Sequence, residues 1–423
     1  MIESVHEFRW RRALRPAGRW LVLATAVALA WPLRQESSTS VLLPAFSPFL
    51  ALASAISVRS VGVLALLAVP VLLLAMVYPR WFCRLGCPVG LLQEVVERVR
   101  PNASRHWLKW PTLGQWLVLL TLGGALLGYP LFLWLDPLAI FNGFLNAWRQ
   151  PIALTTILTG LGLPLLLLLD VAAPRLWCQR ICPLGAAQEL LRGPRRLFRT
   201  KSRCLESDRV AGAPEVNGGR RWFLTALAGA AVAFAARTLR GQTPPPLRPP
   251  GSLDEQRFTG VCVRCGNCAQ VCPSNIIRPD FGANGVAGFL TPRLCFDKDY
   301  CREDCHRCNR SCPSGAIARL SLTEKRSQVI GLARINDGTC LMVLGRECNA
   351  CVQACPYRAI TIASGEGGFS SCPRVDLKRC NGCGACEVVC PVQPVRAIHV
   401  QRLEGSVRAA PLLRTRHNLL TSP

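Results

Sequence analysis

Thiolate ligation is the chemistry that this sequence offers most clearly, because its cysteines recur at regular spacings. All but five of the 23 cysteines lie after residue 250, where two runs have the form C-x2-C-x2-C-x3-C-P. The runs are Cys262, Cys265, Cys268 and Cys272, and Cys380, Cys383, Cys386 and Cys390. This spacing is typical of bacterial 4Fe-4S proteins, so we expect each run to ligate iron-sulfur clusters.

Two further cysteine groups keep the C-x2-C-x3-C-P ending and change only the distance to the first cysteine. They are Cys301, Cys305, Cys308 and Cys312, and Cys340, Cys348, Cys351 and Cys355. In each motif we expect three cysteines to wrap one cluster, while the fourth, at the start of a helix after the loop, reaches the partner cluster. Zinc sites do not show this three-plus-one pattern. The sequence therefore predicts four 4Fe-4S clusters.

Three cysteines stay outside the four motifs and the N-terminal repeat. Cys295 is an alternative to Cys301 as the first ligand of the second motif. Cys295 and Cys372 are also candidates for a disulfide, which an oxidising compartment would permit. Cys204 is expected to lie in the cytoplasm and to ligate no cluster.

The first half of the chain carries the pattern C-x3-C-P twice, at an offset of 95 residues. Cys83 and Cys87 belong to the first copy, Cys178 and Cys182 to the second, and both copies continue with Gly-x-x-Gln-Glu. Cysteines at i and i+4 of a helix share one face, and the proline after the second cysteine interrupts helical hydrogen bonding. Four such thiolates fit a further iron-sulfur cluster, a copper or zinc ion, or a thiol redox switch.

Long apolar segments must position these motifs, since half of the residues are hydrophobic. Segments near 19–33, 61–79, 112–135 and 152–173 approach the roughly 20 residues that a transmembrane helix needs. Pro44 and Pro48 break the stretch 41–58, for which we expect a loop on the outer surface, with a membrane span as the alternative. Lys and Arg collect at 9–19, 80–109 and 175–221, which predicts that the N-terminus and both C-x3-C-P copies face the cytoplasm.

A twin-arginine export signal lies in the middle of the chain, with Arg220 and Arg221 followed by the apolar run 222–236. Fused behind four spans, this signal would become a fifth span that delivers the folded cysteine-rich domain to the periplasm. We therefore place the protein in the bacterial inner membrane, with a cytoplasmic N-terminus and a periplasmic C-terminal domain. The proline-rich residues 241–251 then form a semi-rigid linker.

The expected fold class is multi-domain, an all-α membrane bundle followed by an α+β ferredoxin-like domain. The boundaries are 1–205 for the membrane domain, 206–240 for the cytoplasmic linker and anchor, 241–251 for the proline-rich linker, 252–400 for the polyferredoxin domain and 401–423 for a tail. Residues 251–423 carry a formal charge of +8, which four clusters of about two negative charges each would balance. Membrane lipid accounts for the basic inner loops, so no nucleic-acid partner is expected.

With these motifs the chain resembles a fusion of NapH- and NapG-type ferredoxin proteins, or of their MauN and MauM counterparts. The likeness rests on the two C-x3-C-P copies, shared with NosR-type membrane proteins, on the signal at Arg220 and Arg221, and on the four cysteine motifs. NapH-type proteins usually carry further ferredoxin motifs after the last span. Residues 183–219 contain Cys204 as their single cysteine, which favours the MauN-like form.

The resemblance implies electron transfer between the quinone pool and a periplasmic redox enzyme of a nitrate reductase or methylamine dehydrogenase type system. Two other classes stay open: an electron donor for assembly or reactivation of a periplasmic metalloenzyme, and an enzyme that reduces a small substrate. No nucleophile–base constellation favours a stand-alone enzyme. None of the five histidines lies in an expected span, so haem is not expected.

The same topology predicts where quinone binds. Roughly 30 Å of hydrocarbon would separate the inner cysteines from the outer domain, so we expect the quinone site at the outer surface, near 136–148. The four inner cysteines would then hold a separate centre. Asp136 and Asp170 are expected at the membrane interfaces.

Overall fold

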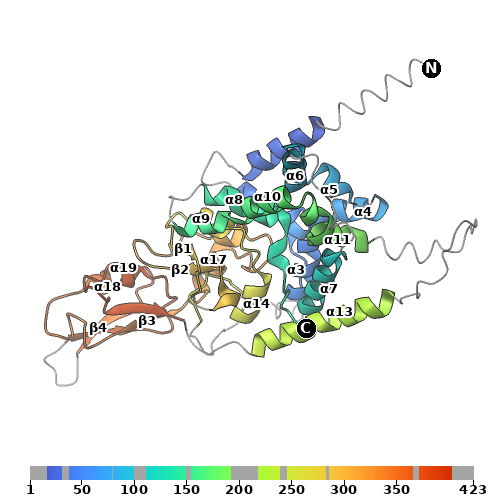
Figure 1. The fold of residues 1–423 in the computed structure, drawn as a ribbon. Coiled ribbons are helices and arrows are strands. Elements are labelled where there is room, and N and C mark those ends of the chain that lie inside the picture. Colours follow the sequence, from blue (N-terminus) through green and yellow to red (C-terminus); the bar gives the residue numbers. More distant parts are fainter. Residues whose placement is uncertain are drawn as a thin grey trace, which may run out of the picture.

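Figure 1 shows a helical region joined to a cysteine-rich region that extends away from it. The computed structural model describes residues 17–30, 38–78, 80–99, 111–148, 154–191, 218–238, 245–282, 285–364 and 371–402. Cys204, the predicted cytoplasmic linker before residue 218 and most of the predicted tail lie outside these residues. The expected order, a helical region followed by a ferredoxin-like region, is confirmed.

The helical region consists of short helices, several of which begin at a proline. The first described helix is Ala17–Ala30. The others are η1 (Ser38–Val41), α2 (Leu42–Ala45), α3 (Pro48–Val58), η2 (Val63–Ala68), α4 (Val69–Val77), α5 (Trp81–Leu85), α6 (Pro88–Val99), α7 (Leu113–Leu126), η4 (Leu133–Leu135), α8 (Pro137–Ala147), α9 (Leu154–Gly160), α10 (Gly162–Ala172), η5 (Trp177–Ile181), α11 (Pro183–Leu190) and α13 (Gly218–Thr238). Proline suits a first helical position because the amide hydrogen it lacks has no partner there.

The stretch 41–58 is helical and buried, so the expectation of an outer-surface loop was wrong. Ser47 caps α3 by accepting a hydrogen bond from the Leu50 amide at 3.2 Å, and Pro48 follows as the first helical residue. Phe49 and Leu50 are each 1% exposed and belong to the main core. The two prolines start and bend helices here instead of interrupting them.

The five expected spans correspond to helices, but their membrane crossing stays a prediction. No single helix in the described parts of the chain is both long and apolar enough to span a bilayer. One bent pair of helices, Thr39–Ala45 and Pro48–Val58, is long and apolar enough when the two are counted together, and they meet at 91°.

Helix α13, which carries the predicted export signal, packs along α7. A Cβ atom on Gly123 of α7 would overlap the backbone of Ala226, and one on Gly229 of α13 would overlap the backbone of Leu120. Glycines at such crossings let two helix backbones approach closely. The two helices are thus fitted to one another, and α13 is an integral part of the bundle.

The cysteine-rich region combines one- and two-turn helices with three two-stranded antiparallel sheets. Its helices are α14 (Glu255–Val261), α15 (Asn267–Gln270), η6 (Val286–Gly288), α16 (Arg307–Arg310), α17 (Leu322–Ser327), α18 (Ala350–Gln353) and α19 (Ala385–Val388). The sheets pair β1 (Ile277–Pro279) with β2 (Pro292–Leu294), β3 (Leu332–Ile335) with β6 (Ile398–Gln401), and β4 (Ile360–Ser364) with β5 (Ser371–Val375). The stretches 275–277 and 359–362, predicted as strands, overlap β1 and β4.

Sheet β3–β6 closes the second half of this region into one unit. Leu332 pairs with Gln401 and Ile335 with Ile398, so residues before the third cysteine motif bond to residues after the fourth. Both motifs lie between these two strands. The third and fourth motifs are therefore held together as one structural module.

Candidate metal centres

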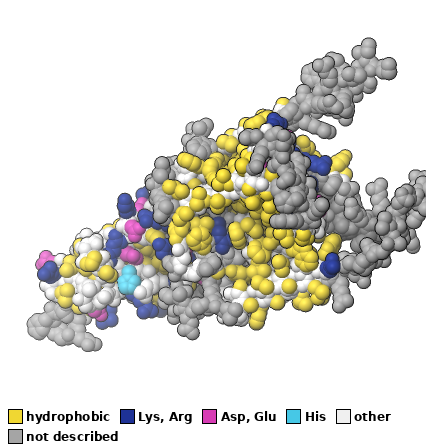
Figure 2. All heavy atoms as spheres, viewed as in Figure 1, with side chains coloured by type: hydrophobic (Ala, Val, Ile, Leu, Met, Phe, Trp, Pro, Cys, Tyr) yellow, Lys and Arg dark blue, Asp and Glu magenta, His cyan; other side chains and the backbone are white. Residues whose placement is uncertain are grey.

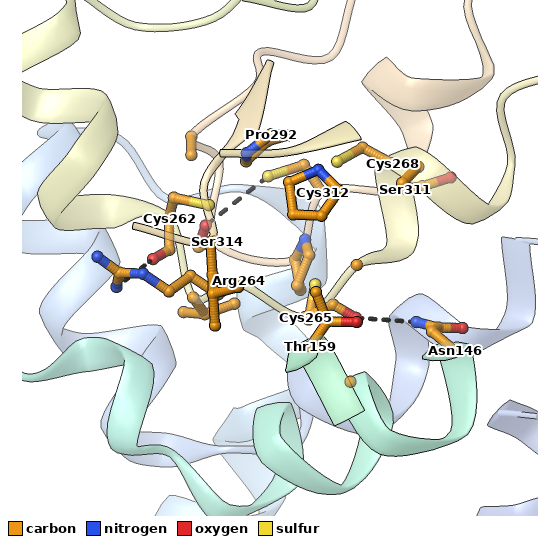
Figure 3. Close-up of a pocket in the computed structure, with 18 of the residues that line it drawn as sticks. Asn146, Thr159, Cys262, Arg264, Cys265, Cys268, Pro292, Ser311, Cys312 and Ser314 are labelled. Atoms are coloured by element: carbon orange, nitrogen blue, oxygen red, sulfur yellow. Dashed lines mark hydrogen bonds between the residues drawn. The ribbon is translucent and has the colours of Figure 1, made fainter. Parts of the chain in front are cut away.

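The first and second cysteine motifs are brought together in two mixed sets. We call Cys262, Cys265, Cys268 and Cys312 site A; these four side chains line one cavity, which Figure 3 shows together with neighbouring residues. Cys312 belongs to the second motif and interacts electrostatically with each of the other three. The fourth cysteine of one motif thus completes the set of the other.

Site B is the reciprocal set and consists of Cys272, Cys301, Cys305 and Cys308. Cys308 interacts electrostatically with the other three. Lys325 lies beside this site, 1% exposed, and donates a hydrogen bond from its ammonium group to the carbonyl of Arg302. Burial raises the pKa of the Cys301 thiol, and the Lys325 ammonium opposes that rise. A buried cation next to these cysteines suits a centre that carries negative charge.

The third and fourth motifs exchange their last cysteines in the same way. Site C consists of Cys340, Cys348, Cys351 and Cys390, and site D of Cys355, Cys380, Cys383 and Cys386. Each set lines its own cavity, with about 340 Å³ of empty space at site C and 300 Å³ at site D. Burial raises the pKa of Cys351 to about 11 and that of Cys383 to about 12.

The loop that carries the first three cysteines depends on left-handed backbone at equivalent positions of the two regular motifs. Arg264 and Gly266 have φ of 57° and 75°, and Gly382 and Gly384 have φ of 74° and 88°. Left-handed residues between cysteines curl the chain, so that successive side chains point into one space. A Cβ atom on Gly384 would also overlap the ring of Phe296.

The place of the helix within each motif differs from the expectation. The one-turn helices α15, α16, α18 and α19 each include the third cysteine of their motif. The fourth cysteine and the proline after it follow the helix and lie outside it. One turn of helix already separates the third and fourth side chains enough to reach different sites.

The four sites do not follow the order of their motifs in the chain. The backbone amide of Cys301 at site B donates to the carbonyl of Cys383 at site D, at 2.9 Å. Cys268 at site A interacts electrostatically with Cys308 at site B, and Cys386 at site D with Cys351 at site C. The spatial order is therefore A, B, D, C. Figure 1 places α18, which carries Cys351 of site C, far from the helical region.

Cys295 and Cys372, which lie outside the motifs, do not belong to sites A to D. Cys295 has Arg293 and Asp297 as its nearest charged neighbours, whereas Cys301 lies at site B. Cys295 and Cys372 are both free thiols, so the structure contradicts a disulfide between them. Cys204 lies outside the described residues.

Site A abuts the helical region through two buried asparagines of α8. The side-chain amide groups of Asn142 and Asn146 donate to the side-chain oxygen of Asn267, at 2.7 and 2.8 Å. Both also donate to the carbonyl of Cys265, at 3.4 and 2.8 Å. These contacts fix the first regular motif against α8, within the segment 136–148 that sequence reasoning had singled out for quinone.

The four cysteines of the C-x3-C-P repeat also converge. We call Cys83, Cys87, Cys178 and Cys182 the quartet; Cys178 interacts electrostatically with the other three. In each copy the second cysteine separates two helices, α5 from α6 and η5 from α11, as the proline predicts. Burial raises the pKa of Cys87 to about 11 and that of Cys182 to about 12.

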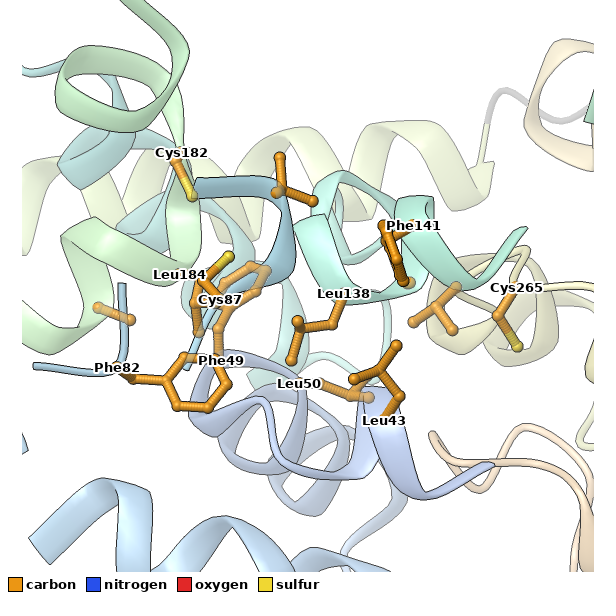
Figure 4. Packing of buried hydrophobic residues seen from close by; sticks show 14 of the residues in the cluster. Leu43, Phe49, Leu50, Phe82, Cys87, Leu138, Phe141, Cys182, Leu184 and Cys265 are labelled. Carbon is orange, nitrogen blue, oxygen red and sulfur yellow. The ribbon is translucent and has the colours of Figure 1, made fainter. Parts of the chain in front are cut away.

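The quartet and site A adjoin one shared apolar core. Cys87, Cys182 and Cys265 belong to one apolar cluster, and Figure 4 shows Leu138 and Phe141 between the first two of these cysteines and Cys265. Helix α7 contacts both regions: Gly114 lies against Cys182, and Gly128, just past the end of the helix, lies against Arg257.

Asp136 and Asp170 are buried, so their expected interfacial positions were wrong. Asp136 is 0% exposed, accepts hydrogen bonds from the Leu138 and Ala139 amides, and also accepts one from the Ser47 hydroxyl. It therefore caps the N-terminus of α8. Asp170 is 1% exposed and accepts from the Arg175 amide at 2.5 Å.

The donor sets fit iron-sulfur clusters. Sites A, C and D each surround a cavity with four cysteines, and thiolate ligands bridged by a multi-atom cluster fill such a space. Among the described residues, no group of three or more cysteine, histidine or carboxylate side chains is arranged to hold one metal ion. Cluster binding would release protons, because burial raises the pKa of these thiols.

Both regions match families of iron-sulfur proteins. Residues 261–341 and 346–393 match the family described as "4Fe-4S dicluster domain". Residues 61–110 and 153–202 match the family described as "4Fe-4S binding domain", and these segments contain the quartet. The chain therefore carries 4Fe-4S clusters.

Individual relatives cover about two fifths of this chain. The methylamine utilization ferredoxin-type protein MauM of Methylobacillus flagellatus is 38% identical over 180 residues, which are 40% of this chain and 76% of that protein. The ferredoxin-type protein NapG of Escherichia coli is 34% identical over 196 residues, 41% of this chain and 82% of that protein. MauM of Paracoccus denitrificans is 34% identical over 177 residues, 39% of this chain and 75% of that protein. No solved structure matches.

Replacing Lys325 by Met should make the cluster at site B harder to reduce, because the change removes a buried positive charge next to it. At a fixed potential the ratio of reduced to oxidised cluster should fall about tenfold, which corresponds to about 59 mV for one electron. A redox titration followed by electron paramagnetic resonance measures this shift. Lys378→Met, at an exposed position, is the matched control, and equal shifts in both variants would contradict the role of Lys325.

Proposed function

The chain belongs to the ferredoxin-type protein family of MauM and NapG, and from that premise we propose that it is a membrane-anchored carrier of electrons between the quinone pool and a periplasmic redox enzyme. Iron-sulfur electron transfer is the activity that the family supports. The membrane anchor, the quinone link and the periplasmic partner are the proposed parts. A nitrate reductase or methylamine dehydrogenase type system would supply the partner.

The observation that carries this proposal is the chain of four cysteine sets from the helical region outward. Each set is proposed to ligate one 4Fe-4S cluster, which uses all sixteen motif cysteines. Site A contacts α8, and sites B and D are joined by the bond between Cys301 and Cys383. Neighbouring clusters in such a row can pass electrons one at a time, so the geometry suits conduction between two distant partners.

The surface of the helical region supports a membrane anchor. Figure 2 shows apolar side chains covering this region, while charged side chains gather on the cysteine-rich region. Exposed apolar residues occur on many of its helices, among them Leu21, Leu73, Leu165, Leu168, Phe223 and Phe234. Apolar area of this extent marks a contact surface, and lipid is the partner we propose. The domain boundaries at 205, 240, 251 and 400 belong to the same proposal.

The close fit of α13 against α7 supports a retained anchor. An export signal that is cleaved needs no matching surface, whereas Gly123 and Gly229 both lie where the partner backbone passes. We propose that Arg220 and Arg221 direct export and that α13 stays as a fifth span. The cysteine-rich region then lies in the periplasm and the N-terminus in the cytoplasm.

The cavity at site A supports a quinone site beside the first cluster. Helices α8 and α9 add Gly143, Asn146 and Thr159 to the lining of this cavity. Asn146 is 3% exposed, and among the described residues its side-chain oxygen has no hydrogen-bond partner. A quinol headgroup that donates to this oxygen would lie next to the cluster that accepts its electrons.

The quartet is proposed to hold a further iron-sulfur cluster. Its four thiols, one pair from each repeat, supply the donor set that such a cluster takes. Its place at the opposite side of the apolar core from site A makes it a separate centre, and Arg19, Arg80, Arg84 and Arg175 line the cavity beside Cys83 and Cys178.

Exchanging single ligands tests the assignment of the sites. In the full chain, Cys268→Ser should remove the cluster at site A and Cys272→Ser the cluster at site B, although the two residues are four apart. Each variant should lose about four iron atoms. Mössbauer and electron paramagnetic resonance spectra should show that the cluster signal lost in one variant differs from the signal lost in the other. Loss of the same signal in both variants would contradict the exchange of fourth cysteines. Cys295→Ser serves as the control and should keep full iron content.

Filling the cavity at site A tests the quinone proposal. Gly143→Leu should slow cluster reduction by a soluble quinol at least tenfold, because the new side chain occupies the space beside site A. Reduction by dithionite should be unchanged. Gly62→Leu, where no atom lies within 4 Å of an added Cβ, is the control. Replacing all four quartet cysteines should leave quinol reduction intact, and loss of reduction in that variant alone would contradict the outer quinone site.

A further inference from the structure

The duplicated Gly-x-x-Gln-Glu sequence places one buried glutamine of each repeat beside the quartet. Gln93 of α6 is 1% exposed and Gln188 of α11 is 0% exposed. Each follows the second cysteine of its repeat by six residues. Burying an amide side chain in an apolar core is unfavourable unless it is hydrogen-bonded. Both glutamine side chains therefore need a hydrogen-bond partner within the core.

Gln188 reaches across from the second repeat to the first. Its side-chain nitrogen lies 3.3 Å from the sulfur of Cys83 and 3.4 Å from the carbonyl oxygen of Leu184. The same cysteine sulfur lies 3.6 Å from the position of a Cβ on Gly185, at the start of α11. An amide N–H of the second repeat thus already points at sulfur held by the first.

Gln93 holds the equivalent position in the first repeat and lacks a protein partner. Neither its side-chain nitrogen nor its side-chain oxygen makes a hydrogen bond within the described residues. It lines one cavity together with Cys83 and Cys178. An unsatisfied buried amide is unfavourable, so a group between the cysteines that accepts its hydrogen bond would stabilise this arrangement.

The glutamates that follow are occupied elsewhere. Glu94 forms an ion pair with Arg19. Glu189 forms an ion pair with Arg80 at 2.6 Å and accepts a hydrogen bond from the side chain of Gln115 at 3.4 Å. These contacts fix the rotational orientation of α6 and of α11 about their helix axes. They keep the carboxylates away from the quartet and turn the glutamines toward it.

We propose that Gln93 and Gln188 are paired positioning residues, each donating a side-chain N–H to the sulfur of the iron-sulfur cluster held by the quartet. This inference rests on the proposed function of the quartet. Hydrogen bonds to cluster sulfur stabilise the reduced form, which carries one more negative charge, and so raise the reduction potential. The duplicated motif then supplies one donor from each repeat to a single centre.

The test uses the full chain and replaces each glutamine by methionine, which keeps the length of the side chain and removes the N–H donor. The quartet signal is first identified as the one lost in Cys83→Ser. At a fixed potential, Gln93→Met and Gln188→Met should each lower the ratio of reduced to oxidised quartet cluster about tenfold, equal to about 59 mV for one electron. Iron content should stay unchanged, and resonance Raman bands of the iron–sulfur bonds should shift.

Gln353→Met is the matched control, because Gln353 is exposed on α18 of the cysteine-rich region and should leave the quartet potential unchanged. If a methionine variant loses its quartet iron while sites A to D keep theirs, Gln93→Leu and Gln188→Leu take its place, since leucine is also neutral and has no side-chain donor. Quartet clusters with unaltered potentials in both glutamine variants would overturn the inference. Absence of any iron signal that depends on Cys83 would instead overturn the proposed function of the quartet.

Discussion

The fold of the cysteine-rich region depends on the exchange of one cysteine between paired motifs. Site A takes Cys312 from the second motif and site B takes Cys272 from the first, so neither centre is complete without both segments. The strands are three to five residues long and form two-stranded sheets, which are marginal by themselves. Cysteine side chains pack against the apolar cluster of this region. Metal binding and folding are therefore expected to be coupled.

The same exchange determines how electrons can move through the molecule. Pairing two motifs places their centres side by side, and the bond between Cys301 and Cys383 then joins the inner centres of the two pairs. Site A remains at the end that contacts α8, through Asn142 and Asn146. Site C remains at the end far from the helical region (Figure 1). Under the proposed function, site A would be the entry for electrons and site C the exit.

Local sequence predicted the motifs, their exchange and the helix breaks at the C-x3-C-P prolines, since these depend on spacing and on the chemistry of single residues. Contacts between distant segments were not predictable from one sequence. Asp136 accepts a hydrogen bond from Ser47, 89 residues earlier, and a backbone bond between Cys301 and Cys383 is one of the contacts that place site B beside site D. The loop expected at 41–58 is a pair of helices because capping by Ser47 and packing of Phe49 outweigh the breaks that prolines suggested.

The central claim is that electrons pass through the sites in the order A, B, D, C, and removing site D tests it most directly. In Cys386→Ser the full chain would be mixed with a soluble quinol, frozen at successive times and examined by electron paramagnetic resonance. Fast reduction of the clusters at sites A and B, with reduction of the cluster at site C delayed at least tenfold, is the predicted result. Reduction of the cluster at site C at the unmodified rate, with site D empty, would contradict the account.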